Sequence, residues 1–144
     1  MARTLLLATG AAWILGGIAG LALAAFGTEA LQRTLPPLVI DTDALRAAIV
    51  AFAVGLLLVG GMHVVIVAGL RRGHRLAWTA GVLMAALLSV TLIALTAASA
   101  TSAVADPERA LGYLAGTLGA ALGAAAYGLA GAQLIAQRRA ESAN

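Results

Sequence analysis

The sequence predicts an all-α integral membrane protein with four transmembrane helices in an up-down-up-down antiparallel bundle. Apolar residues make up 62% of the 144 residues and charged residues only 10%, whereas a soluble domain has about 45–50% and about 25%. The apolar residues form four long runs, and the charged residues gather between these runs. We therefore expect residues 1–144 to form a single four-helix transmembrane domain.

Each of the four runs is long enough to cross a bilayer, because about 20 residues at about 1.5 Å each span the hydrocarbon layer. They must be helices, since lipid offers no water to unpaired backbone groups. The first run carries no charge and is longer than the apolar core of a signal peptide, so we expect it to remain as a span. The second contains only His63 among ionisable residues, and the third only hydroxyls as polar groups. The predicted spans are residues 4–26, 47–70, 76–98 and 110–136.

The connections between the spans contain helix start and stop signals. Asp41 and Asp43 offer capping oxygens before the second span, and Asp106 with Pro107 does so before the fourth. The long connection over residues 27–46 is expected to be an outer loop. Its apolar Leu35–Ile40 segment contains two prolines, so it either rests in the headgroup region or serves as a lid or partner-docking segment.

Arginines are distributed unequally between the two sides of the predicted bundle. One side has six and the other has Arg33, Arg46 and Arg109. The positive-inside rule places the arginine-rich side, with both termini, in the cytoplasm. Arginine without lysine, together with abundant alanine and glycine, suggests a high-GC bacterial gene, so we expect this membrane protein in the inner (plasma) membrane of a bacterium. Because these arginines lie at span ends, we interpret them as topology determinants and expect no nucleic-acid partner. The six are Arg3, Arg71, Arg72, Arg75, Arg138 and Arg139.

Small residues recur at helical spacing in two of the spans. In the fourth span four glycines fall on one helix face, and in the first span Gly16 and Gly20 continue a series with Ala12 and Ala24. Such seams let helix backbones approach closely in lipid. They either pack inside one bundle or bind a second copy or another membrane protein. The glycines of the fourth span are Gly112, Gly116, Gly119 and Gly123.

His63, Ser89 and Thr96 are the candidate polar site within the membrane. An intramembrane histidine is costly, so His63 either bonds a hydroxyl or carbonyl within the bundle or belongs to a proton, ligand or metal site. Ser89 and Thr96 share a helix face, and either bond backbone carbonyls or line a substrate path. Haem is disfavoured, because it usually needs two axial ligands, and only two His63 residues paired from two copies of the chain could supply both. Trp78 lies near a span end, as interfacial anchors do.

No catalytic motif and no metal or cofactor site is predicted. The chain has no cysteine, and we find no nucleotide-binding loop, zinc-protease motif or serine elbow. We therefore expect a non-enzymatic membrane protein that acts through helix association, as an accessory subunit, scaffold or homo-oligomer in contact with membrane lipids. The alternatives are a small transporter or channel lined by the intramembrane histidine, and a lipid-binding protein or membrane-embedded enzyme.

Overall fold

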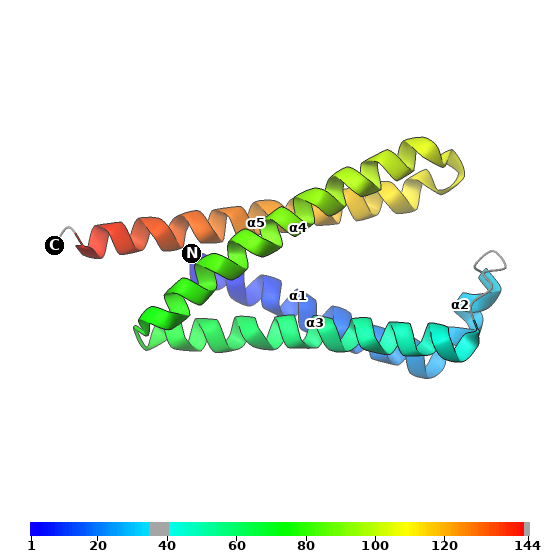
Figure 1. Cartoon of the computed structure of the whole chain (residues 1–144), viewed down its shortest axis with the longest axis horizontal. Helices are drawn as coiled ribbons and strands as arrows, with labels where there is room; N and C mark the ends of the chain where they lie inside the picture. Colours follow the sequence, from blue (N-terminus) through cyan, green and yellow to red (C-terminus); the bar gives the residue numbers. More distant parts are fainter. Residues whose placement is uncertain (35–40, 143–144) are drawn as a thin grey trace. The chain divides into compact units, whose positions relative to one another are not determined.

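The computed structural model describes residues 1–34 and 41–142, and in this part of the chain the regular secondary structure is entirely helical. Four long helices, each apolar and long enough to cross a membrane, are joined by shorter elements (Figure 1). The predicted all-α class with four membrane-spanning helices is thus confirmed. The elements are α1 (Ala2–Phe26), α2 (Thr28–Thr34), α3 (Thr42–Arg71), α4 (Arg75–Ala105), the 3-10 helix η1 (Pro107–Arg109) and α5 (Ala110–Ser142).

Every long helix extends beyond its predicted span. α3 begins at Thr42, where Leu45 N–H donates to the Asp41 carbonyl at 2.9 Å. α4 continues through a hydroxyl-rich stretch to Ala105, and α5 continues past its arginines. The predicted spans stop where the apolar runs stop, because they were drawn from hydropathy. Backbone hydrogen bonds of a helix do not need apolar side chains, so each helix continues into the polar residues that follow. η1 has Pro107 in its first turn as expected, but the Asp106 side chain makes no capping bond there.

The connection predicted as a loop over residues 27–46 is partly helical. After α1 ends, Gly27 N–H donates to Leu23 O at 2.8 Å and Leu31 N–H to Gly27 O at 2.9 Å. The Thr28 hydroxyl donates to Ala24 O at 3.0 Å, and Thr28 is only 2% exposed. The prediction of a loop was therefore wrong for the residues of α2. The hydrogen bonds at Gly27 and Thr28 keep the backbone helical between α1 and α2. The Leu35–Ile40 segment lies outside the described residues.

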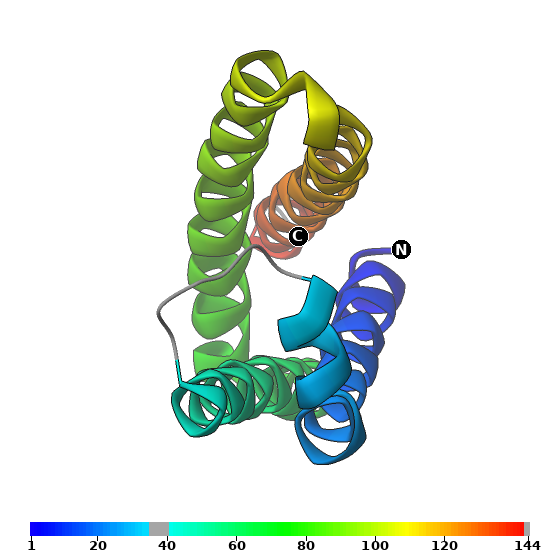
Figure 2. The same ribbon diagram turned by 90° about the vertical axis from the view of Figure 1, so that its right-hand side faces the viewer.

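The contacts between residues divide the chain into two compact units, Ala8–Val64 and Met1–Leu7 with Val65–Asn144. In the first unit, α1 and α3 run side by side (Figures 1 and 2). A Cβ added to Gly10 would lie 2.6 Å from His63 Cβ, and one added to Gly20 would lie 2.9 Å from Ala53 Cβ. Contacts further along α1 thus meet earlier residues of α3, so the two helices are antiparallel.

In the second unit, α4 and α5 form an antiparallel hairpin around η1. Tyr127 is the largest of its fully buried side chains, and Leu92 of α4 fills the space beside Gly123 of α5. The end of α3 and the first residues of α1 complete this core. Its buried members are Ala2, Leu6, Ile66, Val67, Leu70, Met84, Ala85, Leu92, Ala120, Ala124, Tyr127, Ala130 and Leu134.

The turn between α3 and α4 closes through a specific C-terminal motif. His74 N–H donates to Gly69 O at 3.0 Å, and Gly73 N–H donates to Leu70 O at 3.3 Å. These two bonds define a Schellman motif, with Gly73 in the left-handed conformation at φ +73. The carbonyls at the end of α3 are satisfied, and the chain reverses within Arg72–His74.

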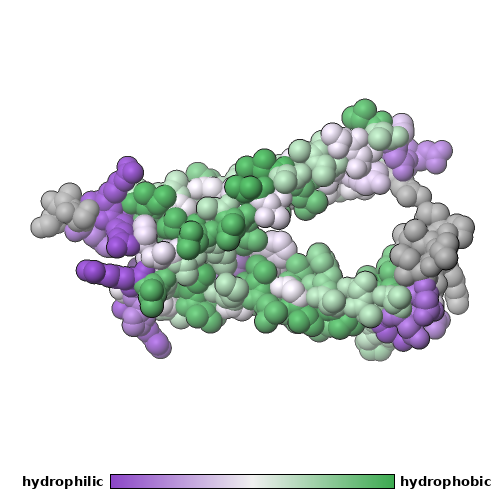
Figure 3. Space-filling model, viewed as in Figure 1, coloured by the Kyte–Doolittle hydropathy of each residue, from purple (hydrophilic) through white to green (hydrophobic). Residues whose placement is uncertain are grey.

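The outer surface of both units is apolar along the helices and polar at their ends (Figure 3). Between 17% and 33% of each candidate span is buried within the protein. Large side chains such as Phe52, Val65 and Leu87 are 69%, 71% and 68% exposed. Water would penalise this exposure, whereas lipid does not. The chain is therefore built as a small multi-pass membrane protein.

Candidate functional site

His63 lies fully buried on α3, opposite the small residues of α1. Its Nδ1–H donates to Val59 O, one turn earlier on the same helix, at 2.7 Å. Gly10 provides the room that the imidazole needs, because a Cβ there would meet His63 Cβ at 2.6 Å. The histidine is thus held by packing on α1 and by a backbone carbonyl of its own helix.

The two hydroxyls of the predicted intramembrane site both bond to backbone carbonyls. Ser89 Oγ donates across the hairpin to Ala124 O of α5 at 3.2 Å. Thr96 Oγ1 donates to Leu92 O on its own helix at 2.7 Å. Ser89 and Thr96 belong to the α4–α5 unit, whereas His63 belongs to the α1–α3 unit.

The two predicted glycines of α1 both face α3. A Cβ at Gly16 would lie 3.4 Å from Leu56 Cδ1, and one at Gly20 would lie 2.9 Å from Ala53 Cβ. Sequence reasoning did not include Gly10 and Gly17, which also contact α3. A Cβ at Gly17 would lie 2.6 Å from Leu57 Cγ.

The four predicted glycines of α5 fall into two pairs. Gly116 and Gly123 face α4, where a Cβ would lie 3.7 Å from Ser99 Oγ and 2.9 Å from Leu92 Cδ1 respectively. A Cβ at Gly112 or Gly119 would meet no atom within 4 Å. The four-residue series on one side of α5 is thus half covered by α4 and half open.

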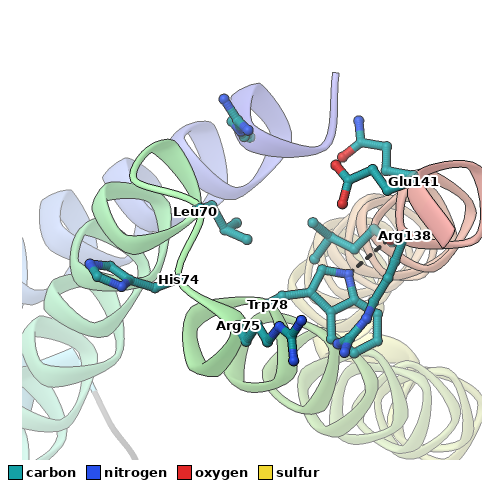
Figure 4. Close-up of a pocket in the computed structure, with 10 residues that line it drawn as sticks. Leu70, His74, Arg75, Trp78, Arg138 and Glu141 are labelled. Atoms are coloured by element: carbon teal, nitrogen blue, oxygen red, sulfur yellow. Dashed lines mark hydrogen bonds between the residues drawn. The ribbon is translucent and has the colours of Figure 1, made fainter. Parts of the chain in front are cut away.

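The arginine-rich end of the α4–α5 unit contains a pocket of about 490 Å³ (Figure 4). It forms where the first residues of α1, the α3–α4 turn and the end of α5 come together. Arg75 and Arg138, which the sequence identified as topology determinants, line it, whereas Arg71, Arg72 and Arg139 do not. The other lining residues are Arg3, Leu70, Gly73, His74, Trp78, Leu134, Gln137 and Glu141.

Trp78 organises the wall of this pocket. Its indole Nε1–H donates to Leu134 O at 2.9 Å. The guanidinium carbon of Arg138 lies 4.1 Å from the centre of the Trp78 ring, which is within the range of a cation–π interaction. Figure 4 shows Arg75 beside the Trp78 ring and Arg138 crossing from α5. The tryptophan that the sequence indicated as an interfacial anchor therefore also positions an arginine.

The chemistry of this pocket is that of an anion site. Its lining contains three arginines and one glutamate. The ion pair of Arg46 with Asp43 at 3.7 Å lies outside the pocket. The described residues contain no group of three or more side chains suited to a metal ion.

Sequence reasoning identified Arg75, Arg138 and Trp78 singly, but not the pocket that unites them. The signal available was that Trp78 and Arg138 lie near the ends of two spans that antiparallel packing brings together. Arg3 was counted only with the arginine-rich side, and Glu141 gave no signal of its own, because an isolated charge near a chain end is ordinary. No protein-family model, curated protein or solved structure matches this chain.

Proposed function

We propose that this small membrane protein acts through association of its helices in the bilayer, with a second copy of the chain as the first partner to test. The observation that supports this proposal is the open face of small residues on α5. Gly112 and Gly119 are seven residues apart, so they share a helix face, and each has open space where a Cβ would be. Ala115 lies between them and is exposed.

Small residues on a lipid-facing helix favour close helix contact. With no hydrophobic driving force inside lipid, helices associate by van der Waals packing, and a flat glycine face lets two backbones approach. The same chain uses glycine in this way at its internal contacts, where Gly123 of α5 accommodates Leu92 of α4. The open face of Gly112, Ala115 and Gly119 offers the same geometry to another helix. The proposal assigns no catalytic reaction to the chain.

Substitution of Gly119 by leucine tests the association. We expect Gly119→Leu to abolish dimers seen by crosslinking in vesicles, because its side chain would hold a partner backbone away. Ala121→Leu is the matched control: it adds the same side chain at an exposed position on the opposite face of α5 and should leave dimers intact. A monomeric wild-type chain, or equal crosslinking of all three proteins, would contradict the proposal.

We also propose that the chain lies in the inner (plasma) membrane of a bacterium, with both termini and the α3–α4 turn in the cytoplasm. The support is the excess of arginines at that end, six against three. Positively charged short segments are retained on the cytoplasmic side during insertion.

A further inference from the structure

We propose that the pocket around Trp78 and Arg138 binds the phosphate of an anionic phospholipid headgroup. The pocket lies within the Met1–Leu7 and Val65–Asn144 unit. This assignment is independent of the helix association proposed above. It rests on three features: the charge of the lining, the fixed position of Arg138, and the apolar residues beneath.

The charge of the pocket favours an anion. Arg3, Arg75 and Arg138 come from three different segments of the chain, and Glu141 is the single acidic residue in the lining. The three arginines and the one glutamate of the lining together carry a net positive charge of two. Guanidinium groups match phosphate well, because their planar N–H donors can bond two phosphate oxygens at once.

Arg138 is already held in place for such a contact. Its guanidinium stacks on the Trp78 ring at 4.1 Å, and the indole is itself fixed by the bond to Leu134 O at 2.9 Å. With its carbon over the ring, the guanidinium keeps the N–H groups that do not face the indole able to donate to a ligand. A side chain ordered before binding loses less conformational entropy when the ligand arrives.

The apolar residues favour a lipid over a free phosphate ion. Leu70 and Leu134 line the pocket and are 8% and 1% exposed. Both lie near ends of predicted spans, and Trp78 lies near the end of its own predicted span, where aromatic anchors typically meet the headgroups. A volume of about 490 Å³ exceeds the need of a bare phosphate and suits a headgroup with the start of its acyl chains. Basic pockets between spanning helices are suited to anionic headgroups.

Native mass spectrometry of the full chain in neutral detergent tests the proposal. The protein is titrated with dioctanoyl phosphatidylglycerol, dioctanoyl phosphatidylcholine and inorganic phosphate in parallel. We expect one saturable phosphatidylglycerol site, with affinity for the other two at least about tenfold weaker. Phosphatidylcholine binding of equal strength would show that the charge is irrelevant. Equal binding of inorganic phosphate would show a free-anion site. Either result overturns the lipid assignment.

Three variants separate the pocket from the general charge of this end. Arg75→Gln removes a pocket donor and should weaken phosphatidylglycerol binding about tenfold, as expected for a charged hydrogen bond. Arg71→Gln removes the same charge from the neighbouring turn, outside the lining, and should stay within about twofold of wild type. Equal weakening by both would overturn the proposal.

Glu141→Gln provides a gain of affinity that loss of folding cannot imitate. Glu141 lines the same pocket as the arginines, so its carboxylate repels a phosphate bound there. Removal of this charge should tighten phosphatidylglycerol binding about two- to fivefold. Glu141 is exposed, so its substitution should not disturb folding. Unchanged or weaker phosphatidylglycerol binding by Glu141→Gln would contradict the proposed lipid site.

Discussion

Single glycines determine how closely α1 can approach α3. Gly10 and Gly60 lie at the level of His63, where a Cβ at Gly60 would come 2.5 Å from Ile14 Cγ1 and 3.0 Å from Gly10 O. The imidazole is fully buried at this crossing. Glycine is required at these positions because it has no side chain, not because of its backbone freedom. A methyl group on either helix would force α1 and α3 apart.

Substitution of Gly10 by alanine is therefore expected to destabilise the α1–α3 pair. Its new Cβ would lie 2.6 Å from His63 Cβ, an atom fixed to the backbone of α3, so the helices must move. Overpacking of this kind costs about 1–3 kcal/mol. The free energy of unfolding, measured by SDS titration from mild detergent, should fall accordingly. Gly55→Ala, where a Cβ meets nothing within 4 Å, is the control, and an equal loss in both variants would refute the contact.

The hydroxyls of α4 should differ in their contribution to stability. Ser89 Oγ bonds α5 at Ala124 O, so Ser89→Ala should lower the free energy of unfolding by about 0.6 kcal/mol, the average for interhelical bonds in membranes. Thr96 Oγ1 bonds its own helix at Leu92 O, and Thr96→Val should change stability less. The same SDS titration compares the two variants. A larger loss for Thr96→Val would contradict this ranking.

Features of single residues were predictable when they depended only on residue order, and not when they depended on contacts between helices. The sequence shows that His63 is the one histidine, acidic or basic residue within the predicted spans, because this requires only the order of residues. It does not show that the imidazole bonds Val59 O of its own helix, since carbonyls of its own helix and of other helices are equally plausible partners for a buried ring. Nor could it separate Gly112 and Gly119 from Gly116 and Gly123, since helical phase alone does not locate the edge of α4.

At the scale of elements, the α3–α4 turn depends on one backbone conformation. Gly73 adopts φ +73, which L side chains reach only at a cost of about 1–2 kcal/mol. A Cβ there would meet no atom within 4 Å, so the strain would come from the backbone alone.

We therefore expect Gly73→Ala to lower the free energy of unfolding by about 1–2 kcal/mol. Gly73→Asn should lose less, because asparagine tolerates the left-handed region better. Thermal unfolding followed by circular dichroism in detergent would measure both. Equal melting temperatures for glycine, alanine and asparagine would contradict the motif.

The sequence predicted the long apolar helices well, but it predicted poorly where those helices end and which polar segments are helical. The four spans follow from composition, because only a helix satisfies its backbone within lipid. α2 was missed because Thr28–Thr34 contains polar residues and carries no span signal, although its helix continues closely from α1. The extensions of α3 and α5 were missed for the same reason.

At the scale of the whole molecule, the few charged residues gather between the apolar runs. Charged residues are 10% of the sequence and lie outside the predicted spans, and within the unit of α4 and α5 they include Arg3, Arg75 and Arg138 of the pocket. Composition predicted this gathering of arginines. It could not predict the pocket, because this needs α1, α4 and α5 to bring arginines from distant parts of the sequence around one tryptophan.

Orientation in the membrane should follow the arginine count. Replacement of Arg71, Arg72 and Arg75 by glutamine leaves three arginines on each side, so we expect the single orientation to become a mixture. The chain has no cysteine, and an Ala140→Cys reporter at an exposed position can be labelled with a membrane-impermeant maleimide on intact cells. Labelling should rise from near zero to a substantial fraction. Replacement of Arg33 and Arg46 by glutamine strengthens the bias instead and should leave the reporter protected, so labelling that responds equally to both changes would refute arginine control of topology.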